Sequence, residues 1–180
     1  MELKKYQLEA IDWVVANKRC WLCLDTGLGK TVVALKAASR VADNVLVICP
    51  AFLVCNWENE ISKWTPEISH RITLRSYHYW NEERTKKAIL ANYDMLVLDE
   101  SHYLKNWKAK RTKLIAQALA PTIPRVVAMT ATPYVRSAED FHPTLSFLQP
   151  GKWGKRKEFV EKYCLKKFIT LPKRKYGKAD

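Results

Sequence analysis

The residues best suited to chemistry lie in a glycine-rich segment near the N-terminus. Residues 25–31 read Asp-Thr-Gly-Leu-Gly-Lys-Thr, and they stand between an apolar stretch and a segment of helical periodicity. Glycines there let backbone N–H groups converge on phosphate oxygens, which the start of a helix also attracts. The spacing predicts a phosphate-binding loop, although Leu24 stands where the usual pattern has its first glycine. The expected ATP-binding residues of this loop are Thr26, Gly27, Leu28, Gly29, Lys30 and Thr31.

Two adjacent carboxylates follow the apolar run 95–98. Asp99 is placed to hold Mg²⁺ through water, together with the Thr31 hydroxyl, and Glu100 is placed to orient and deprotonate an attacking water. In an open parallel sheet both strand ends lie at the same edge, where Lys30 reaches the β- and γ-phosphates. Lys30, Asp99 and Glu100 are therefore the predicted catalytic residues of an ATP–Mg²⁺ site.

A third polar segment follows the apolar run 125–129, with hydroxyls at Thr130 and Thr132. Alone it is a commonplace turn. Beside the first two motifs, its hydroxyls are placed to sense the γ-phosphate. His102 directly follows the acidic pair and is a candidate for coupling nucleotide to nucleic acid.

The elements that must position these residues alternate between short apolar strands and amphipathic helices. Strands are expected at 19–24, 44–49, 71–77, 95–98 and 125–129, and helices at 5–17, 29–41, 52–64, 82–91, 107–119, 138–148 and 154–164. In the first helix, Leu8, Ile11 and residues 13–15 are expected to face inward, and in the fifth, Leu114, Ile115, Ala118 and Leu119. Trp13, Trp57 and Trp64 are expected to pack in the core. Such alternation predicts an α/β fold with a mostly parallel sheet and helices on both faces.

Taken together, the ordered motifs resemble those of superfamily-two helicases, and within them the Swi/Snf-type double-stranded DNA translocases. The resemblance covers roughly residues 3–165 and implies a RecA-like P-loop NTPase lobe that binds DNA. Residues 99–102 resemble the family's DEAH-like motif. The resemblance implies that Gln7 contacts the adenine base. It also implies nucleic-acid contacts or coupling roles for Pro50, Ala51, Ser76, Tyr77, His102, Lys105, Asn106, Thr130 and Thr132.

The resemblance also predicts the domain organisation. Residues 1–150 correspond to the first lobe, and the basic segment 151–180 to a junction with a second lobe. Nothing in the sequence resembles motifs IV, V and VI, which belong to that second lobe and include arginines of the ATP site. Only eleven residues separate Trp64 from Ser76, a shorter stretch than in most members of the family. We therefore expect a second RecA-like lobe, in cis or in trans, as a partner.

Charge points to the same class of partner. The chain carries a formal charge of +13 over 180 residues, which favours a polyanion such as DNA. No apolar run approaches the roughly 20 residues that span a bilayer, and no signal peptide is evident. We expect no membrane partner and an intracellular protein, cytoplasmic, or nuclear if the source is eukaryotic.

Two other classes of protein fit parts of the pattern. One is a non-catalytic regulatory module, or an inactive fragment, that binds ATP and DNA without turnover. The other is a different P-loop enzyme such as a kinase. Intact Lys30, Thr31, Asp99 and Glu100 favour an ATPase, and residues 130–133 disfavour a kinase.

The five cysteines include a C-x-x-C pair, Cys20 and Cys23. Because the pair falls in an expected strand, the two sulfurs should point to opposite faces. We expect this pair, and likewise Cys49, Cys55 and Cys164, to be free thiols buried as small hydrophobic residues rather than a zinc or redox site.

Overall fold

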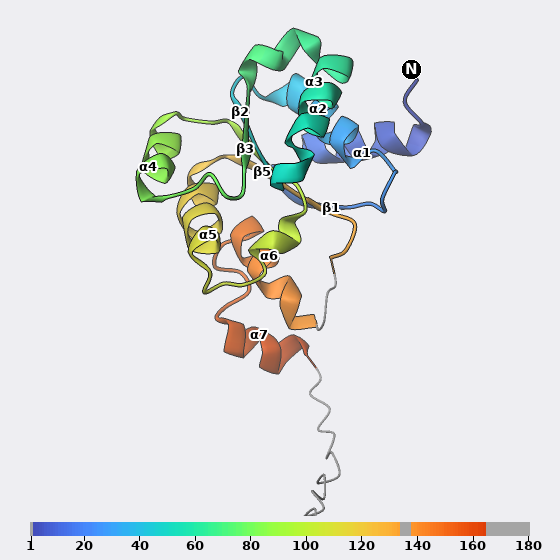
Figure 1. The fold of residues 1–180 in the computed structure, drawn as a ribbon. Coiled ribbons are helices and arrows are strands. Elements are labelled where there is room, and N and C mark those ends of the chain that lie inside the picture. Colours follow the sequence, from blue (N-terminus) through green and yellow to red (C-terminus); the bar gives the residue numbers. More distant parts are fainter. Residues whose placement is uncertain (1, 134–137, 165–180) are drawn as a thin grey trace, which may run out of the picture.

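The computed structural model describes residues 2–133 and 138–164. A parallel sheet of five strands forms its centre, in the order β1-β5-β4-β2-β3 (Figure 1). The strands are β1 (Arg19–Cys23), β2 (Val45–Cys49), β3 (Ile72–Ser76), β4 (Met95–Leu98) and β5 (Arg125–Thr130). The register places Cys20 beside Val127 in the β1–β5 pair, and Val45 beside Met95 in the β2–β4 pair. The expected α/β fold with a parallel sheet is confirmed.

Helices cover both faces of the sheet. Figure 1 shows α1, α2 and α3 on one side and α4, α5 and α6 on the other. The α-helices are α1 (Lys5–Ala16), α2 (Lys30–Val41), α3 (Val54–Trp64), α4 (Glu82–Leu90), α5 (Lys110–Thr112), α6 (Phe141–Leu148) and α7 (Arg156–Tyr163). Short 3₁₀ turns are η1 (Ala51–Leu53), η2 (Pro66–Arg71), η3 (Ser101–Leu104), η5 (Ala120–Thr122) and η6 (Ala138–Asp140), and η4 (Lys113–Leu119) is π-helical.

Two hydrophobic cores result from this layering. Every residue of β2 and β4 is buried, as expected for strands covered on both faces. Because side chains alternate along a strand, Val45 and Val47 join the core beneath α1, α2 and α3, whereas Leu46 and Ile48 join the opposite core. The interior strands thus fix the carboxyl edge of the sheet, where the predicted site residues lie.

Most element boundaries agree with the sequence within a residue or two, but two inward faces were predicted wrongly. In α1, Ile11 and Val14 are buried, whereas Leu8 is 42% exposed and Trp13 is 46% exposed. The buried face of α1 is therefore narrower than the apolar pattern suggested. The basic helix begins at Lys110 rather than 107, and its π-helical register leaves Ala118 exposed and buries Ala116 instead.

The expected orientation of the pair in β1 is confirmed, because Cys20 is buried and Cys23 is exposed on the opposite face. The predicted burial of all five cysteines is wrong: Cys49 is buried like Cys20, but Cys55 is exposed like Cys23, and Cys164 is half-buried. Across residues 2–133 and 138–164, no group of three or more His, Cys, Asp or Glu side chains is placed to hold a metal ion. None of the helices described there is long and apolar enough to cross a membrane.

The basic C-terminal segment is described as far as residue 164. Its helix α7 buries Phe159, whose ring lies 5.1 Å from that of His142 in α6. Residues 165–180 lie outside the described residues. A domain boundary at residue 150 stays a prediction.

Candidate active site

The glycine-rich loop joins the end of β1 to the start of α2. Gly27 and Gly29 have φ values of 81° and 82°, in the left-handed region that favours glycine. A Cβ at Gly29 would come within 2.5 Å of the Gln7 Nε2 atom, so no larger residue fits there without movement. A Cβ at Gly27 would meet nothing within 4 Å, so the loop backbone faces open space at that point. This shape suits a phosphate group approaching the loop closely.

Lys30 and Thr31 stand in the first turn of α2, where the helix N-terminus carries partial positive charge. The Lys30 ammonium donates to the carbonyl oxygens of Leu24 at 2.9 Å and Asp25 at 3.2 Å, which holds it over the loop. The ammonium is thereby kept at the place where phosphate oxygens would enter.

Helix α1 rests on the same loop. The Gln7 Nε2 atom donates to the Leu28 carbonyl oxygen at 3.3 Å, and the Tyr6 hydroxyl donates to the same oxygen at 3.2 Å. The Gln7 Oε1 atom accepts from the Lys4 backbone N–H at 2.9 Å, which fixes the amide orientation. Gln7 is therefore at the loop, as the family resemblance required, and its contact with a base stays a prediction.

The Asp99 carboxylate is held through both oxygens. Its Oδ2 atom accepts from the Trp57 indole N–H at 2.9 Å, and its Oδ1 atom accepts from the Glu100 backbone N–H at 2.9 Å. Burial raises the pKa of Asp99, while the Trp57 hydrogen bond and the positive charge of Lys30 act in the opposite direction. Lys30 and Asp99 both lie beyond the carboxyl ends of parallel strands, β1 and β4, which are separated by β5.

Glu100 connects the acidic pair to the segment after β5. Its backbone is left-handed, with φ of 47°, which is uncommon outside glycine. Its Oε2 atom lies 3.1 Å from His102 Nδ1 and accepts from the Thr130 hydroxyl at 3.3 Å. The Thr130 oxygen in turn accepts from the Thr132 backbone N–H at 3.0 Å. The structure therefore brings together Glu100, His102, Thr130 and Thr132, which the sequence places in two separate motifs.

The predicted nucleic-acid contacts have mixed exposure. Ala51, Lys105, Asn106 and Thr132 are exposed, Ser76 and His102 are half-buried, and Pro50 and Thr130 are buried. Tyr77 requires a correction, because its side chain is only 2% exposed. Its hydroxyl donates to the Asp99 carbonyl oxygen at 2.8 Å, and its ring stacks on Tyr103 with centroids 5.2 Å apart. Tyr77 is thus placed to hold the Asp99 backbone, and its side chain does not form part of the surface.

Trp57 is the residue of this site that sequence reasoning missed. Its core position was expected, and it is buried, but its hydrogen bond to Asp99 was not foreseen. A buried indole N–H normally has a partner, which is the one available signal. Only the sheet order shows that the partner is the carboxylate after β4.

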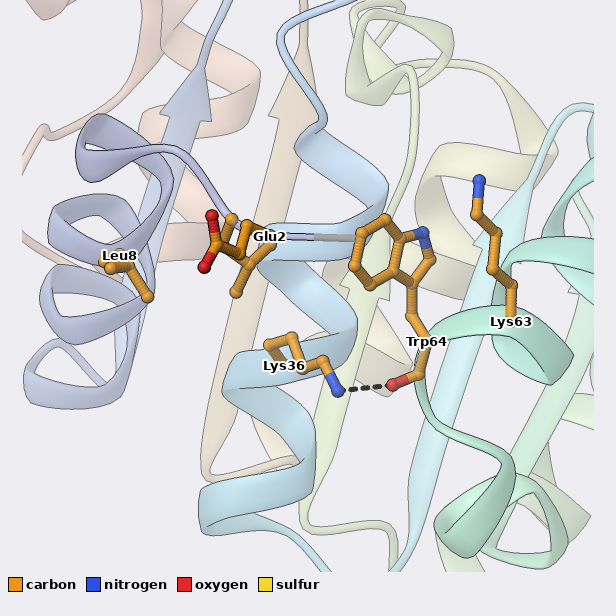
Figure 2. Close-up of a pocket in the computed structure, with 6 residues that line it drawn as sticks. Glu2, Leu8, Lys36, Lys63 and Trp64 are labelled. Atoms are coloured by element: carbon orange, nitrogen blue, oxygen red, sulfur yellow. Dashed lines mark hydrogen bonds between the residues drawn. The ribbon is translucent and has the colours of Figure 1, made fainter.

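A groove of about 730 Å³ lies elsewhere, between the start of α1, helix α2 and the end of α3, and is lined by Glu2, Leu3, Leu8, Lys36, Lys63 and Trp64. Figure 2 shows these side chains around the groove. Inside it the Lys36 ammonium donates to the Trp64 carbonyl oxygen. Its lining includes no residue of the glycine-rich loop and neither Asp99 nor Glu100. Its size therefore does not identify it as the reacting centre, and the convergence of the three polar segments does so better.

The donor groups at the carboxyl edge fit ATP with Mg²⁺. An open glycine backbone and an ammonium suit phosphate oxygens, while a hydroxyl and a carboxylate are oxygen ligands of the kind that Mg²⁺ prefers. Lys30, Thr31 and Asp99 are the side chains that would hold them.

Comparison with known proteins agrees with this geometry. A family model described as the SNF2-related domain matches residues 6–75 and 68–169. The Protein CHROMATIN REMODELING 5 of Arabidopsis thaliana is 28% identical over 200 residues, which cover 89% of this chain and 11% of that protein. The human DNA annealing helicase and endonuclease ZRANB3 is 26% identical over 172 residues, which cover 82% of this chain and 16% of that protein.

A solved structure shows the same fold. The Sulfolobus solfataricus SWI2/SNF2 ATPase core, determined in complex with dsDNA, superposes with a TM-score of 0.78 at 25% identity. The match covers 91% of this chain and 39% of that one. The chain therefore belongs to the SNF2-related domain family and has the RecA-like fold of a SWI2/SNF2 ATPase core.

Proposed function

We propose that this chain is the ATP-binding lobe of a DNA-dependent ATPase, which couples hydrolysis to movement along duplex DNA together with a second RecA-like lobe. The observation that carries the proposal is the meeting of three polar segments at one edge of the sheet. Lys30 lies in the loop-to-helix segment after β1, Asp99 and Glu100 follow β4, and Thr130 is the last residue of β5. Hydrogen bonds join the last two segments, and the charge of Lys30 acts on Asp99.

ATP with Mg²⁺ supplies the phosphoryl group and an electrophilic centre when it is bound. The N–H groups of the Gly27–Gly29 backbone and the Lys30 ammonium would bind phosphate oxygens, with the ammonium giving up its two carbonyl partners. Thr31 and Asp99 would hold the cation, and Trp57 keeps the Asp99 carboxylate in one orientation.

Glu100 is the proposed base. Its carboxylate orients a water and takes a proton from it, while Thr130 and His102 hold the carboxylate in place. Because the buried Thr130 at the end of β5 accepts from the backbone N–H of the exposed Thr132, a change at the γ-phosphate can reach the surface through these contacts.

DNA binding is proposed to act mainly through phosphates. The charge of +13 supports this, as does the Sulfolobus relative, which was solved in complex with dsDNA. Phosphate contacts carry no base information, so sequence preference should be weak. The affinity should fall steeply with salt, with a log–log slope of about 0.9 per phosphate neutralised.

The ATP site is tested with Lys30→Ala. Isothermal titration with ATP and Mg²⁺ should show saturable binding for the wild type and none for Lys30→Ala, because the phosphates lose their main side-chain charge. Lys36→Ala is the matched control, since this lysine stands on the same helix and donates to Trp64 instead. Equal ATP affinity in the wild type and in Lys30→Ala would refute the proposed site.

A further inference from the structure

A small cationic pocket lies at the opposite edge of the sheet from the glycine-rich loop. It has a volume of about 200 Å³ and lies between the edge strand β3 and helix α4. Three of its lining residues are basic, Arg75, Arg84 and Lys87, and none is acidic. Since β1 and β3 are the two outer strands, this pocket is separate from the ATP site.

Both arginines are gathered around one tyrosine. The guanidinium carbon of Arg75 lies 4.9 Å from the centroid of the Tyr79 ring, and that of Arg84 lies 4.6 Å from it. The two charges are therefore closer to each other than the Debye length of about 10 Å at 0.1 M salt. Their side-chain hydrogen bonds go to backbone oxygens, of Leu74 for Arg75 and of Tyr79 for Arg84. Among the described residues neither forms an ion pair with a carboxylate, whereas Lys87 pairs with Glu83 at 2.7 Å.

Trp80 also lines the pocket and is 9% exposed, so its ring forms an apolar wall. The two cations repel each other in the protein alone, and an anion in the pocket would relieve that repulsion.

The volume of the pocket limits the size of the anion that it can bind. Sites for drug-sized ligands measure roughly 300–1,000 Å³, so 200 Å³ is too small for a whole nucleotide. A single phosphate group fits, and guanidinium groups match its geometry with two parallel N–H donors.

We propose that this pocket binds one backbone phosphate of DNA, as a contact additional to those expected at Ala51 and Ser76. The inference rests on the proposed DNA-binding function. Arg75 directly precedes Ser76 in β3, so the proposed contact is next in sequence to the one expected at Ser76. The Arg75 and Arg84 side chains bind the phosphate.

The test measures duplex binding by fluorescence anisotropy over a range of salt concentrations, using the whole chain. Arg75→Gln with Arg84→Gln should weaken binding about tenfold, because a hydrogen bond to a charged group is worth roughly that factor. The log–log salt slope should fall by about 0.9, the value for one phosphate. Arg40→Gln with Arg71→Gln is the matched control, since each of these arginines already pairs with an aspartate, Asp12 or Asp43. The control pair should leave the salt slope unchanged.

Three outcomes would overturn either the phosphate contact or the proposed function. Duplex binding by the wild type with the same slope in both double variants would overturn the pocket and leave the proposed function standing. No duplex binding by the wild type would overturn the proposed function itself. Saturable binding of inorganic phosphate that the Arg75/Arg84 variant loses, without any effect on DNA, would assign the pocket to a free anion and refute the backbone contact.

Folding is checked by thermal unfolding of each variant. Arg84→Gln also removes the bond to the Tyr79 carbonyl oxygen, so it can lower stability by itself. Arg75→Gln alone then serves as the test variant, since its hydrogen bond goes only to the neighbouring residue's carbonyl oxygen. It should still reduce the affinity severalfold while ATP binding stays at the wild-type level.

Discussion

At the scale of single residues, the Asp99 carboxylate depends on one indole. Trp57 donates to Asp99 Oδ2 at 2.9 Å inside the protein, where water cannot replace the bond. Trp57→Phe keeps an aromatic ring but leaves that oxygen without its donor. We expect the free energy of unfolding to fall by about 1–3 kcal/mol, and the Mg²⁺ concentration for half-maximal ATP binding to rise about tenfold or more.

A matched control exists on the same helix. The Trp64 indole donates to Glu60 at 2.9 Å, away from the three polar segments. Trp64→Phe should leave the Mg²⁺ dependence of ATP binding at the wild-type value. A merely structural role for Trp57 predicts reduced stability with an unchanged Mg²⁺ requirement, and that pattern would contradict the assignment. Titration of Mg²⁺ against fluorescent ATP binding separates the two.

The cysteines allow a second prediction at this scale. Burial raises the pKa of Cys20 to about 12 and that of Cys49 to about 12, so about one thiol in ten thousand is ionised at pH 8. Cys55 is exposed. A thiol reagent such as DTNB should therefore modify Cys55 rapidly in the native protein, and Cys20 and Cys49 only after unfolding in urea. Rapid native labelling of Cys20 or Cys49, located by mass spectrometry, would contradict this.

At the scale of elements, Arg19 connects the start of β1 to the segment around η5 and to the end of α6. Its guanidinium donates to the carbonyl oxygens of Ala120, Ile123, Phe147 and Leu148 at 2.8–3.1 Å. The last two belong to the final turn of α6, whose carbonyls have no partner within the helix. Arg19→Met should lower the free energy of unfolding by about 3 kcal/mol, and Arg19→Lys by less.

Urea denaturation measures this effect, with Arg40→Met as the control. Arg40 forms an exposed pair with Asp12, and such pairs are worth about 1 kcal/mol or less. Hydrogen exchange should also show faster exchange of the α6 amides in Arg19→Met. Equal losses in Arg19→Met and Arg40→Met would show that the four carbonyl contacts do not stabilise the junction.

The positions of elements were predictable where the hydrophobic pattern is strong. The buried face and the register of a helix were not predictable where they depend on which elements pack against it. The apolar runs that became β2 and β4 have no polar face, so they had to be strands covered on both sides. Leu8 and Trp13 follow a helical pattern, but no other element packs over them, and both are exposed. The local sequence pattern does not reveal the absence of a neighbouring element. The π-helical register of η4 was likewise hidden, because each residue in it is an ordinary helix former.

The candidate site also has features that the local sequence predicts and features that depend on tertiary structure. Its polar segments were visible because each follows an apolar run, and strand ends meet at one edge. Contacts between segments depended on the sheet order β1-β5-β4-β2-β3, which the sequence does not contain as a local signal. This is why Glu100–Thr130, Trp57–Asp99 and the Arg75–Arg84 pocket appear only in three dimensions.

At the scale of the whole molecule, we expect this lobe to bind ATP without hydrolysing it rapidly. In the proposed mechanism, Lys30, Thr31 and Asp99 would neutralise part of the charge that develops on a transferred phosphoryl group, and Glu100 would position the water. In related nucleotidases an arginine from another part of the assembly adds about 10³–10⁵ in rate. The family resemblance assigns such arginines to a second lobe facing this site.

We therefore predict that the 180 residues by themselves bind ATP but hydrolyse it slowly, with or without DNA. Movement along DNA also requires two lobes that open and close, since one rigid lobe has no second state to alternate with. The measurement is steady-state ATPase activity at saturating duplex, for this chain alone and for the chain fused to a second lobe of the same family. The fusion should raise DNA-stimulated turnover by orders of magnitude, and Glu100→Gln in the fusion should abolish the gain. Rapid DNA-stimulated turnover by the chain alone, lost in Glu100→Gln, would instead mean that these residues already contain every group the reaction needs.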